Sequence, residues 1–281
     1  MKKLRTIIRW VIWTIAGLYI TTIVLLHIPA VQGFLAQKVG DVAGNKLGTE
    51  VHVGRIDLGF INRFVLDDIL IYDQSHKKML SASRVGARVD IWHLLRTGEI
   101  NISSAQLFGL RAELYKTSKD AKPNFQFVLD SLASKDTTSH TPLHLSINSL
   151  VIRHGNIKYD CLDVPTTPNR LNLNHINVSD ISSYLILNKL DDTSVWADLR
   201  ALAFKEASGL EVKQLAFELK ANQQQAALRD FIFDGINSKI ALKELLTTYT
   251  FNNKKLDFNT LRYTIKDFKA AIKPSDFAPI L

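Results

Sequence analysis

Cysteine is almost absent from this sequence. Cys161 is the single one among 281 residues, so no intrachain disulfide can hold the fold together, and cysteine usage indicates neither an oxidising nor a reducing compartment. Signatures of common enzymes are absent as well: the chain contains no G-x-S-x-G nucleophile elbow, no G-x-G-x-x-G turn, no P-loop and no H-E-x-x-H helix. These absences argue against an enzyme.

Titratable residues are also poorly spaced for chemistry. His140 and His144 are four residues apart, but Pro142 between them prevents a helix that would bring both imidazoles to one metal ion. The adjacent acids Asp67-Asp68 and Asp191-Asp192 would point to opposite faces of a strand, so neither pair predicts a carboxylate dyad. We therefore expect no catalytic residue, no metal site and no cofactor.

Positive charge is concentrated at the N-terminus. Lys2, Lys3, Arg5 and Arg9 supply half of the formal net charge of +8, and no acidic residue lies among them. The remainder of the chain is close to balanced and shows no basic stripe of the kind that nucleic-acid-binding proteins present. We expect no nucleic-acid partner.

An uncharged apolar run, WVIWTIAGLYITTIVLLHI, follows at residues 10–28 if His27 is neutral. At ~1.5 Å per residue, a helix of this length nearly crosses a hydrocarbon core of ~30 Å. The preceding cations place the N-terminus in the cytoplasm and the rest of the chain across the membrane. Residues 1–28 are thus predicted to be a basic cytoplasmic end and a signal-anchor transmembrane helix. The expected membrane contacts are Trp10, Trp13, Leu18, Tyr19, Leu25 and Ile28.

Two other interpretations of this run are open. A cleavable signal peptide would have a shorter apolar region, of ~7–15 residues, and a small-x-small cleavage site. The nearest candidate, Ile28-Pro29-Ala30, has a bulky residue at its first position. A buried core helix would leave the basic flank without a purpose. Both alternatives fit less well than an uncleaved anchor.

Residues 29–48 predict a second, amphipathic helix. Pro29 ends or kinks the spanning helix, and Gly48 stops the new one. Its polar face is not especially basic, as a helix lying on a membrane surface usually is, so we expect it to plug the end of the following structure. The expected apolar face comprises Val31, Phe34, Leu35, Val39, Val42 and Leu47.

From residue 50 the spacing of apolar residues changes to a period of two, which is typical of β-strands. Val51 and Val53 alternate on one parity and Ile56 and Leu58 on the other, so a bulge or bend is expected near Gly54. We predict a mainly β region at residues 49–281 with strands of the usual ~5–6 residues. Interruptions are expected at a corner (residues 92–98), a short helix (124–132) and a polar, mobile loop (134–142).

A repeat of 45 residues is visible within this region. Residues 100–115 and 145–159 place apolar side chains at matching positions, which suggests a repeated strand-bend-strand unit. The matching residues are Ile102, Ala105, Leu107, Ala112 and Leu114 in the first copy and Ile147, Leu150, Ile152, Ile157 and Tyr159 in the second.

Alternation of this kind has two structural interpretations. Two sheets can bury their apolar faces against each other in a sandwich, which the pattern alone favours. Alternatively, one curved sheet can keep an apolar face available to lipid chains or apolar strands. The pattern does not decide which parity faces inward. The groove-lining candidates are Val85, Ala87, Val89, Ile147, Ile176, Val212, Phe217, Phe231 and Phe233.

The order and spacing of several loose motifs resemble the N-terminal region of the AsmA-like/TamB family, of the Bacteroidota type. The first motif, L-G-x-x-V-x-V-G-x-I-x-L, spans residues 47–58. It is followed by L-x-D-I-x-I-x-D at 66–73 and L-L-x-x-G-x-I-x-I at 94–102. The segment FKEASGLEVKQLAFEL at 204–219 also looks like the family, so the resemblance covers nearly the whole chain.

The resemblance implies a Gram-negative inner-membrane anchor and an elongated, taco-like periplasmic β-groove. Its implied function is outer-membrane biogenesis, with phospholipid acyl chains carried between membranes. The alternative is a chaperone-like module that assembles outer-membrane proteins with a barrel partner. Members of the TamB type are much longer, and no terminal helix or capping turn is apparent before Leu281. We therefore expect an N-terminal fragment, with any barrel contact in a missing C-terminal region.

Overall fold

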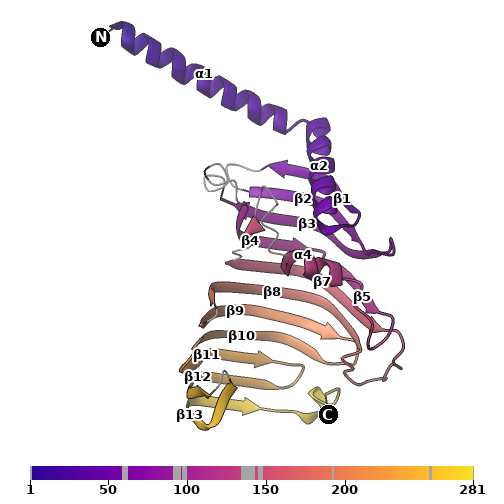
Figure 1. The fold of residues 1–281 in the computed structure, drawn as a ribbon. Coiled ribbons are helices and arrows are strands. Elements are labelled where there is room, and N and C mark those ends of the chain that lie inside the picture. Colours follow the sequence, from indigo (N-terminus) through magenta and orange to yellow (C-terminus); the bar gives the residue numbers. More distant parts are fainter. Residues whose placement is uncertain are drawn as a thin grey trace.

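Two helices lead into one large, curved β-sheet (Figure 1). This arrangement comes from a computed structural model, which describes residues 2–58, 63–90, 96, 100–133, 143–144, 148–191, 193–252 and 255–280. The chain is mainly β, as the period-two pattern predicts. The expected corner at residues 92–98, apart from helical Arg96, and the expected loop at 134–142 lie outside the described residues.

Helix α1 (Lys2–Leu26) extends away from the sheet (Figure 1). Within the described residues it is the one helix that is long and apolar enough to cross a membrane, and its apolar window, Arg9–Leu26, is not buried by the rest of the chain. The six predicted membrane contacts are all exposed. Ile28, the last of them, lies just beyond α1 and caps the next helix.

Helix α2 (Pro29–Leu47) begins and ends where the sequence predicts. Pro29 occupies its first turn, where a missing N–H costs no hydrogen bond, and extended Ile28 precedes it. Gly48 ends the helix in the left-handed conformation (φ 68°), which glycine adopts without a Cβ clash. The chain therefore turns sharply between α1 and α2.

The face by which α2 packs differs in part from the predicted one. Phe34 and Val42 are exposed, whereas Gln32, Ala36 and Gly40 are buried. Small residues face the sheet because the helix approaches strand β1 (Val51–Leu58) closely: a Cβ on Gly40 would lie 2.8 Å from the carbonyl oxygen of Val51. The helix covers the first strand, as expected, through these small residues together with Leu35 and Val39, two members of the predicted face that pack against the core.

The strands of the described residues follow one path of paired neighbours, β1-β2-β3-β4-β7-β8-β9-β10-β11-β12-β13. Off this path, β5 pairs with β3 and β7, and β6 pairs with β4. Two packed sheets are not formed by these strands, so the sandwich interpretation does not hold for them. The remaining bounds are β2 Arg63–Tyr72, β3 Lys78–Val89, β4 Ile100–Phe108, β5 Arg111–Lys116, β6 Leu143–His144, β7 Ser149–Cys161, β8 His175–Asp191, β9 Ser194–Glu206, β10 Glu211–Asn222, β11 Gln225–Asp234, β12 Lys239–Asn252 and β13 Lys255–Ala271.

The 45-residue repeat corresponds to a real neighbour relationship. β4 and β5, which are separated at Gly109, both run parallel to β7, whereas other neighbours on the main path are antiparallel. Ala105 pairs with Leu150, and Ala112 pairs with Ile157. The two copies therefore lie side by side in register. Ile147, which also belongs to the repeat, lies outside the described residues.

Most strands are longer than predicted, because strand interiors contain residues that usually indicate turns. β13 spans 17 residues and continues across Asp267, which has a φ of 50°, and β11 continues through Asp230 at 48°. β8 likewise continues through Asp180 at 55°. Left-handed aspartates are tolerated at bulges, where the strand bends without ending.

Two shorter helices complete the structure. Helix α4 (Gln126–Ala133) overlaps the predicted helical segment, ends one residue beyond it and contacts α2. After β13, a 3₁₀ helix, η1 (Pro274–Asp276), turns the chain back toward the sheet. The expectation of no terminal helix or capping turn is therefore wrong, because η1 and the turns after it cap this part of the chain.

Candidate functional site

One line of paired residues crosses all strands on the main path, and ten of its eleven members are apolar. We call this line the apolar row. Paired residues of neighbouring strands share a face, so these side chains all point to the same side of the sheet. The apolar row comprises Ile56, Leu66, Val85, Leu107, Ile152, Ser183, Leu202, Leu215, Phe233, Ile240 and Ala270.

Seven predicted groove residues lie on this apolar face. Val85 and Phe233 belong to the apolar row, and Ala87 pairs with Phe64 beside it. The rings of Phe217 and Phe231 stack with centroids 6.5 Å apart, and Ile176 and Val212 lie farther along β8 and β10. The side chain of Val89 and the whole of Ile147 fall outside the described residues. The sequence parity therefore selects a common face.

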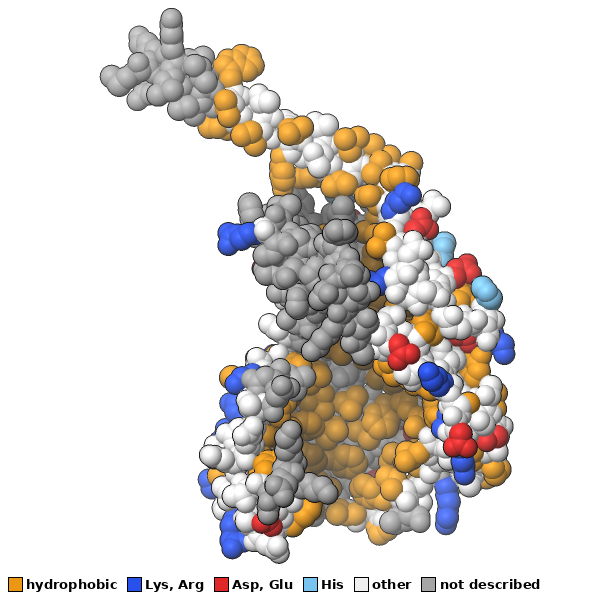
Figure 2. Space-filling model, viewed as in Figure 1, with side chains coloured by type: hydrophobic (Ala, Val, Ile, Leu, Met, Phe, Trp, Pro, Cys, Tyr) orange, Lys and Arg blue, Asp and Glu red, His pale blue; other side chains and the backbone are white. Residues whose placement is uncertain are grey.

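The apolar face surrounds a visible hollow. Figure 2 shows its wall lined by hydrophobic side chains. Some strand interiors contain a residue with a left-handed backbone, which changes the face to which the following side chains point. Ile265 lies two residues before Asp267 and Phe268 one residue after it, yet both side chains share the apolar face. Such shifts keep apolar side chains on one face on both sides of a bend. The same left-handed conformation occurs at Asp68, His154, Asp180 and Asp230.

The opposite face is charged and organised in cross-strand ion pairs. Asp67 accepts hydrogen bonds from Arg84 (2.7 Å) and Arg55 (2.9 Å) on the two neighbouring strands. The Arg84 contact, with that of Arg55, holds the pKa of Asp67 below its usual value although burial opposes this. Glu244 likewise contacts Lys266 (2.6 Å) and Arg229 (2.9 Å). One face of the sheet is thus suited to water and the other to apolar material.

The apolar face is covered unequally along the sheet. At β1 and β2, which we call the covered end, α2 packs on the face and leaves Ala36 0% and Ile56 6% exposed. At β11–β13, which we call the open end, Ile265 is 52% and Phe268 58% exposed on the same face. The apolar side chains of the open end therefore have no comparable layer among the described residues.

Buried acids fasten the turns along one edge of the sheet, which we call the locked rim. Asp73, after β2, accepts hydrogen bonds from the backbone N–H groups of Ser75 (2.8 Å) and Lys77 (3.0 Å) and from the Tyr115 hydroxyl (2.9 Å). Burial alone would raise the pKa of Asp73, but these hydrogen bonds outweigh it and lower the pKa. The carboxylate therefore joins the β2–β3 turn to strand β5.

A buried acid fastens a turn in the same way at the end of β9. Glu206 accepts hydrogen bonds from the backbone N–H groups of Ser208 (2.7 Å) and Asn177 (3.1 Å). As at Asp73, these bonds lower the pKa of Glu206 against the effect of burial. The sequence predicts a structural role for neither acid, although Asp73 ends the motif at 66–73. In both turns the carboxylate accepts from the N–H of the serine two residues on, as in side-chain-stabilised turns.

His175 closes a third turn on the locked rim. Its Nδ1 lies 3.0 Å from Oδ1 of Asp160 and its Nε2 lies 2.7 Å from the carbonyl oxygen of Val164. Both partners are acceptors, so the doubly protonated imidazolium satisfies both contacts. Asp160, followed by the Val164 carbonyl, raises the pKa of His175, whereas burial and nearby Lys158 oppose this.

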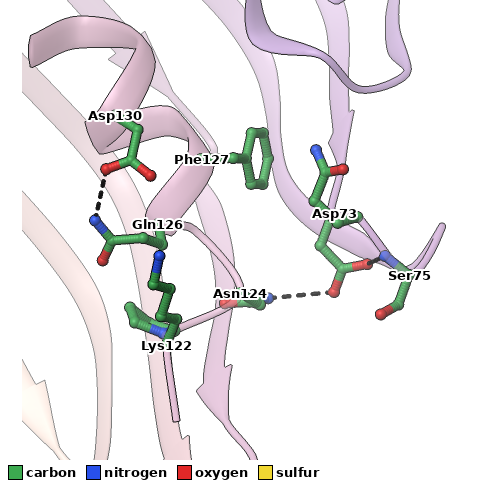
Figure 3. A pocket seen from close by; sticks show the side chains of 9 residues that line it. Asp73, Ser75, Lys122, Asn124, Gln126, Phe127 and Asp130 are labelled. Carbon is green, nitrogen blue, oxygen red and sulfur yellow. Dashed lines mark hydrogen bonds between the residues drawn. The ribbon is translucent and has the colours of Figure 1, made fainter. Parts of the chain in front are cut away.

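A cavity of about 350 Å³ lies beside the first of these turns (Figure 3). Its polar side chains largely engage one another: Asn124 donates to Asp73 at 3.4 Å and Gln126 to Asp130 at 2.8 Å. The cavity therefore lies between the start of α4 and the β2–β3 turn. It is lined by Asp73, Gln74, Ser75, Lys122, Pro123, Asn124, Gln126, Phe127 and Asp130.

Catalytic geometry does not emerge from the predicted titratable residues. Asp67 is engaged by arginines, and its neighbour Asp68 has a left-handed backbone conformation (φ 54°). His140 lies outside the described residues, as does the side chain of His144. Searching the described residues finds no group of three His, Cys, Asp or Glu side chains that could hold a metal ion. The apolar face is the strongest candidate site.

Comparisons with known proteins do not identify a family for this chain. No protein-family model matches the chain, and no curated protein matches it. The AsmA-like/TamB resemblance therefore stays a prediction. What can be stated directly is a mainly β chain with an N-terminal helix able to span a membrane and a sheet whose two faces differ in polarity.

Proposed function

We propose that this chain is a membrane-anchored carrier of phospholipid acyl chains. In this proposal α1 lies in the inner membrane of a Gram-negative cell with its N-terminus in the cytoplasm. The sheet stands in the periplasm as a taco-like groove and serves outer-membrane biogenesis, without catalysis. The observation that carries the proposal is the apolar row, which crosses eleven strands and, among the described residues, has no covering helix at the open end.

The length of the apolar row suits this task. Ten strand spacings of ~4.8 Å make a row of roughly 48 Å. One acyl chain spans about half of a ~30 Å bilayer core, so the row can hold more than one chain end to end. Each methylene that leaves water for the apolar face contributes about 0.8 kcal/mol, so partitioning alone retains a chain.

The polarity of the sheet supports passive transfer. Ion pairs such as Arg229–Glu244–Lys266 keep the outer face soluble, while the polar rims leave room for headgroups in water. The α1–α2 junction would place the covered end near the bilayer. Because α2 fills the apolar face there, the proposed loading position lies beyond α2 rather than at the junction itself.

Two substitutions on neighbouring residues test the proposal. Phe231 faces the apolar side, whereas Ile232 points to the outer face opposite Ala216 and Ala241. The full chain is purified from membranes, and its bound lipid is measured by mass spectrometry. Phe231→Asp should remove most copurified phospholipid because a carboxylate in the groove opposes acyl binding. Ile232→Asp should retain it, and equal retention by both variants would contradict the proposal.

A second candidate function rests on β13. This strand of 17 residues pairs with β12 alone among the described strands, and Phe258 and Phe268 on it are exposed. An exposed edge can bind an unfolded β segment by strand addition, as an assembly module for outer-membrane proteins would. Lipid-free protein that binds outer-membrane protein segments, with binding lost when proline replaces Ile265, would favour this alternative.

A further inference from the structure

The segment after β13, residues 273–280, lies across the locked rim instead of continuing along the sheet (Figure 1). We call it the strap. The carbonyl oxygen of Pro279 accepts a 2.7 Å hydrogen bond from the backbone N–H of Leu171, before β8. A Cβ on Gly209, between β9 and β10, would lie 3.9 Å from Cγ of Pro279. The strap therefore reaches two separate turns of the sheet.

Polar contacts hold the strap to a third turn. Asp276 is 6% exposed and accepts hydrogen bonds from the backbone N–H (2.7 Å) and the side-chain amide (3.0 Å) of Asn237. Ser238, between β11 and β12, accepts a hydrogen bond from the backbone N–H of Lys273 at 2.9 Å. Burial alone would raise the pKa of Asp276, but the bonds from Asn237 and Ser238 lower it to about 2.

The strap also places one aromatic ring on the apolar face. Phe277 stacks on Phe233 with ring centroids 5.7 Å apart and an interplanar angle of 28°. Phe233 belongs to the apolar row, between Leu215 and Ile240. The ring therefore occupies the position that an acyl chain would take at this end of the row. The polar anchors at Asp276, Ser238 and Pro279 are separate from this ring.

We propose that the strap is a built-in competitor of the acyl chain, with the Phe277 ring blocking the groove at Phe233. This inference rests on the proposed function, because it needs the apolar face to bind acyl chains. A lipid arriving at this end must displace the Phe277 ring while the polar anchors keep the strap close by. Acyl chains therefore reach Phe233 only when the Phe277 ring has moved. They reach Phe231, two residues away on the same strand and face, without this obstacle.

Photocrosslinking distinguishes the two positions in the full, membrane-embedded chain. A photoreactive benzophenone amino acid replaces Phe231 or Phe233 one at a time, so an aromatic ring is kept at either position. After irradiation, adducts with phospholipid are quantified by mass spectrometry. With the strap intact, lipid adducts are expected at position 231 and are several-fold fewer at position 233. Phe277→Ala should raise the adduct at 233 several-fold and leave that at 231 unchanged.

Two matched variants separate the ring from general loosening. Phe277→Trp keeps an aromatic plug and should keep position 233 closed. Phe268→Ala removes an exposed ring from the same face and should not open position 233. Equal lipid adducts at 233 with and without Phe277 would overturn the strap and leave the proposed function standing. Absence of lipid adducts at both 231 and 233 in every variant would overturn the proposed function itself.

Discussion

The covered end and the open end carry the same kind of strand and differ in what lies on it. At the covered end, α2 turns the apolar face into a small core around Ala36, Val53 and Ile56. At the open end, residues on the same face, such as Ile265 and Phe268, stay more than half exposed. Strand pattern alone therefore does not decide between core and groove. The presence or absence of a covering layer decides between them.

This difference has a consequence for binding. Soluble proteins rarely expose contiguous apolar patches larger than a few hundred Å², and a larger patch usually marks a binding surface. The apolar face of the open end is contiguous from β11 to β13, because paired residues such as Phe233 and Ile240 continue it from strand to strand. An apolar partner, rather than water, is the expected neighbour of this face.

The largest expected effect comes from making the same truncation at both ends. Ile56→Ala leaves a cavity in the covered core and should lower the free energy of unfolding by about 2–5 kcal/mol. Ile265→Ala removes a half-exposed side chain and should cost less than about 1 kcal/mol. Urea unfolding of the full chain in micelles measures both. Equal losses would show that the open end has a core of its own.

Two glycines of α2 provide the next test. Gly40→Ala would place a Cβ 2.8 Å from the Val51 carbonyl oxygen, so the helix must shift, at a cost of about 1–3 kcal/mol. Gly33 has no atom within 4 Å of its would-be Cβ, and Gly33→Ala should be neutral or stabilise the helix by up to about 1 kcal/mol. Thermal unfolding of both variants measures these two changes in stability. A harmless Gly40→Ala would break the claim of close helix–sheet contact.

The sequence predicts this architecture where local chemistry and structure agree. Pro29 and Gly48 bound α2 as expected, and the 45-residue repeat anticipates the parallel pairing of Ala105 with Leu150. Bulges defeat the prediction of strand length, because Asp267 signals a turn locally and yet lies inside a strand.

Contacts between distant segments set the remaining limit. The buried face of α2 is chosen by close approach to β1, which favours Ala36 over the larger Phe34. The strap depends on Asp276 meeting Asn237, 39 residues earlier, and no local pattern marks that contact. The apolar face could be predicted from alternation, whereas its uneven cover could not.

Acid should sharpen the comparison, because the Asp276 carboxylate fastens the strap to the β11–β12 turn of the open end. The folded pKa of Asp276 is about 2 against an ordinary 3.8, and that of Glu206 is also lowered. Groups with lowered pKa stabilise the fold above their ordinary pKa, and this contribution is lost as pH falls through the folded value. Between pH 3.8 and about 2, hydrogen exchange should rise at the strap before it rises in the α2–β1 core.

A matched variant identifies the responsible group. Asp276→Asn removes the titrating carboxylate, so the strap should exchange faster at neutral pH and show less additional change on acidification. Glu211→Gln, at the start of β10, changes a carboxylate for which no such anchoring bond is found and serves as the control. A strap that loosens identically in acid with and without Asp276 would refute this assignment.

The smallest expected effect has the opposite pH dependence and concerns the turn after β7. The pKa of His175 is raised above 6.5, so its contribution is present below pH 6.5 and is lost as pH rises through the folded value. Deprotonation leaves one acceptor, either the Asp160 carboxylate or the Val164 carbonyl, without its donor. Hydrogen exchange of residues 162–174 should therefore rise modestly above neutral pH. Because Lys158 also contacts Asp160, the carboxylate keeps a partner and the turn should not unfold. His175→Gln should exchange at a constant elevated level across this range, and a wild-type response retained in that variant would rule out His175 as the switch.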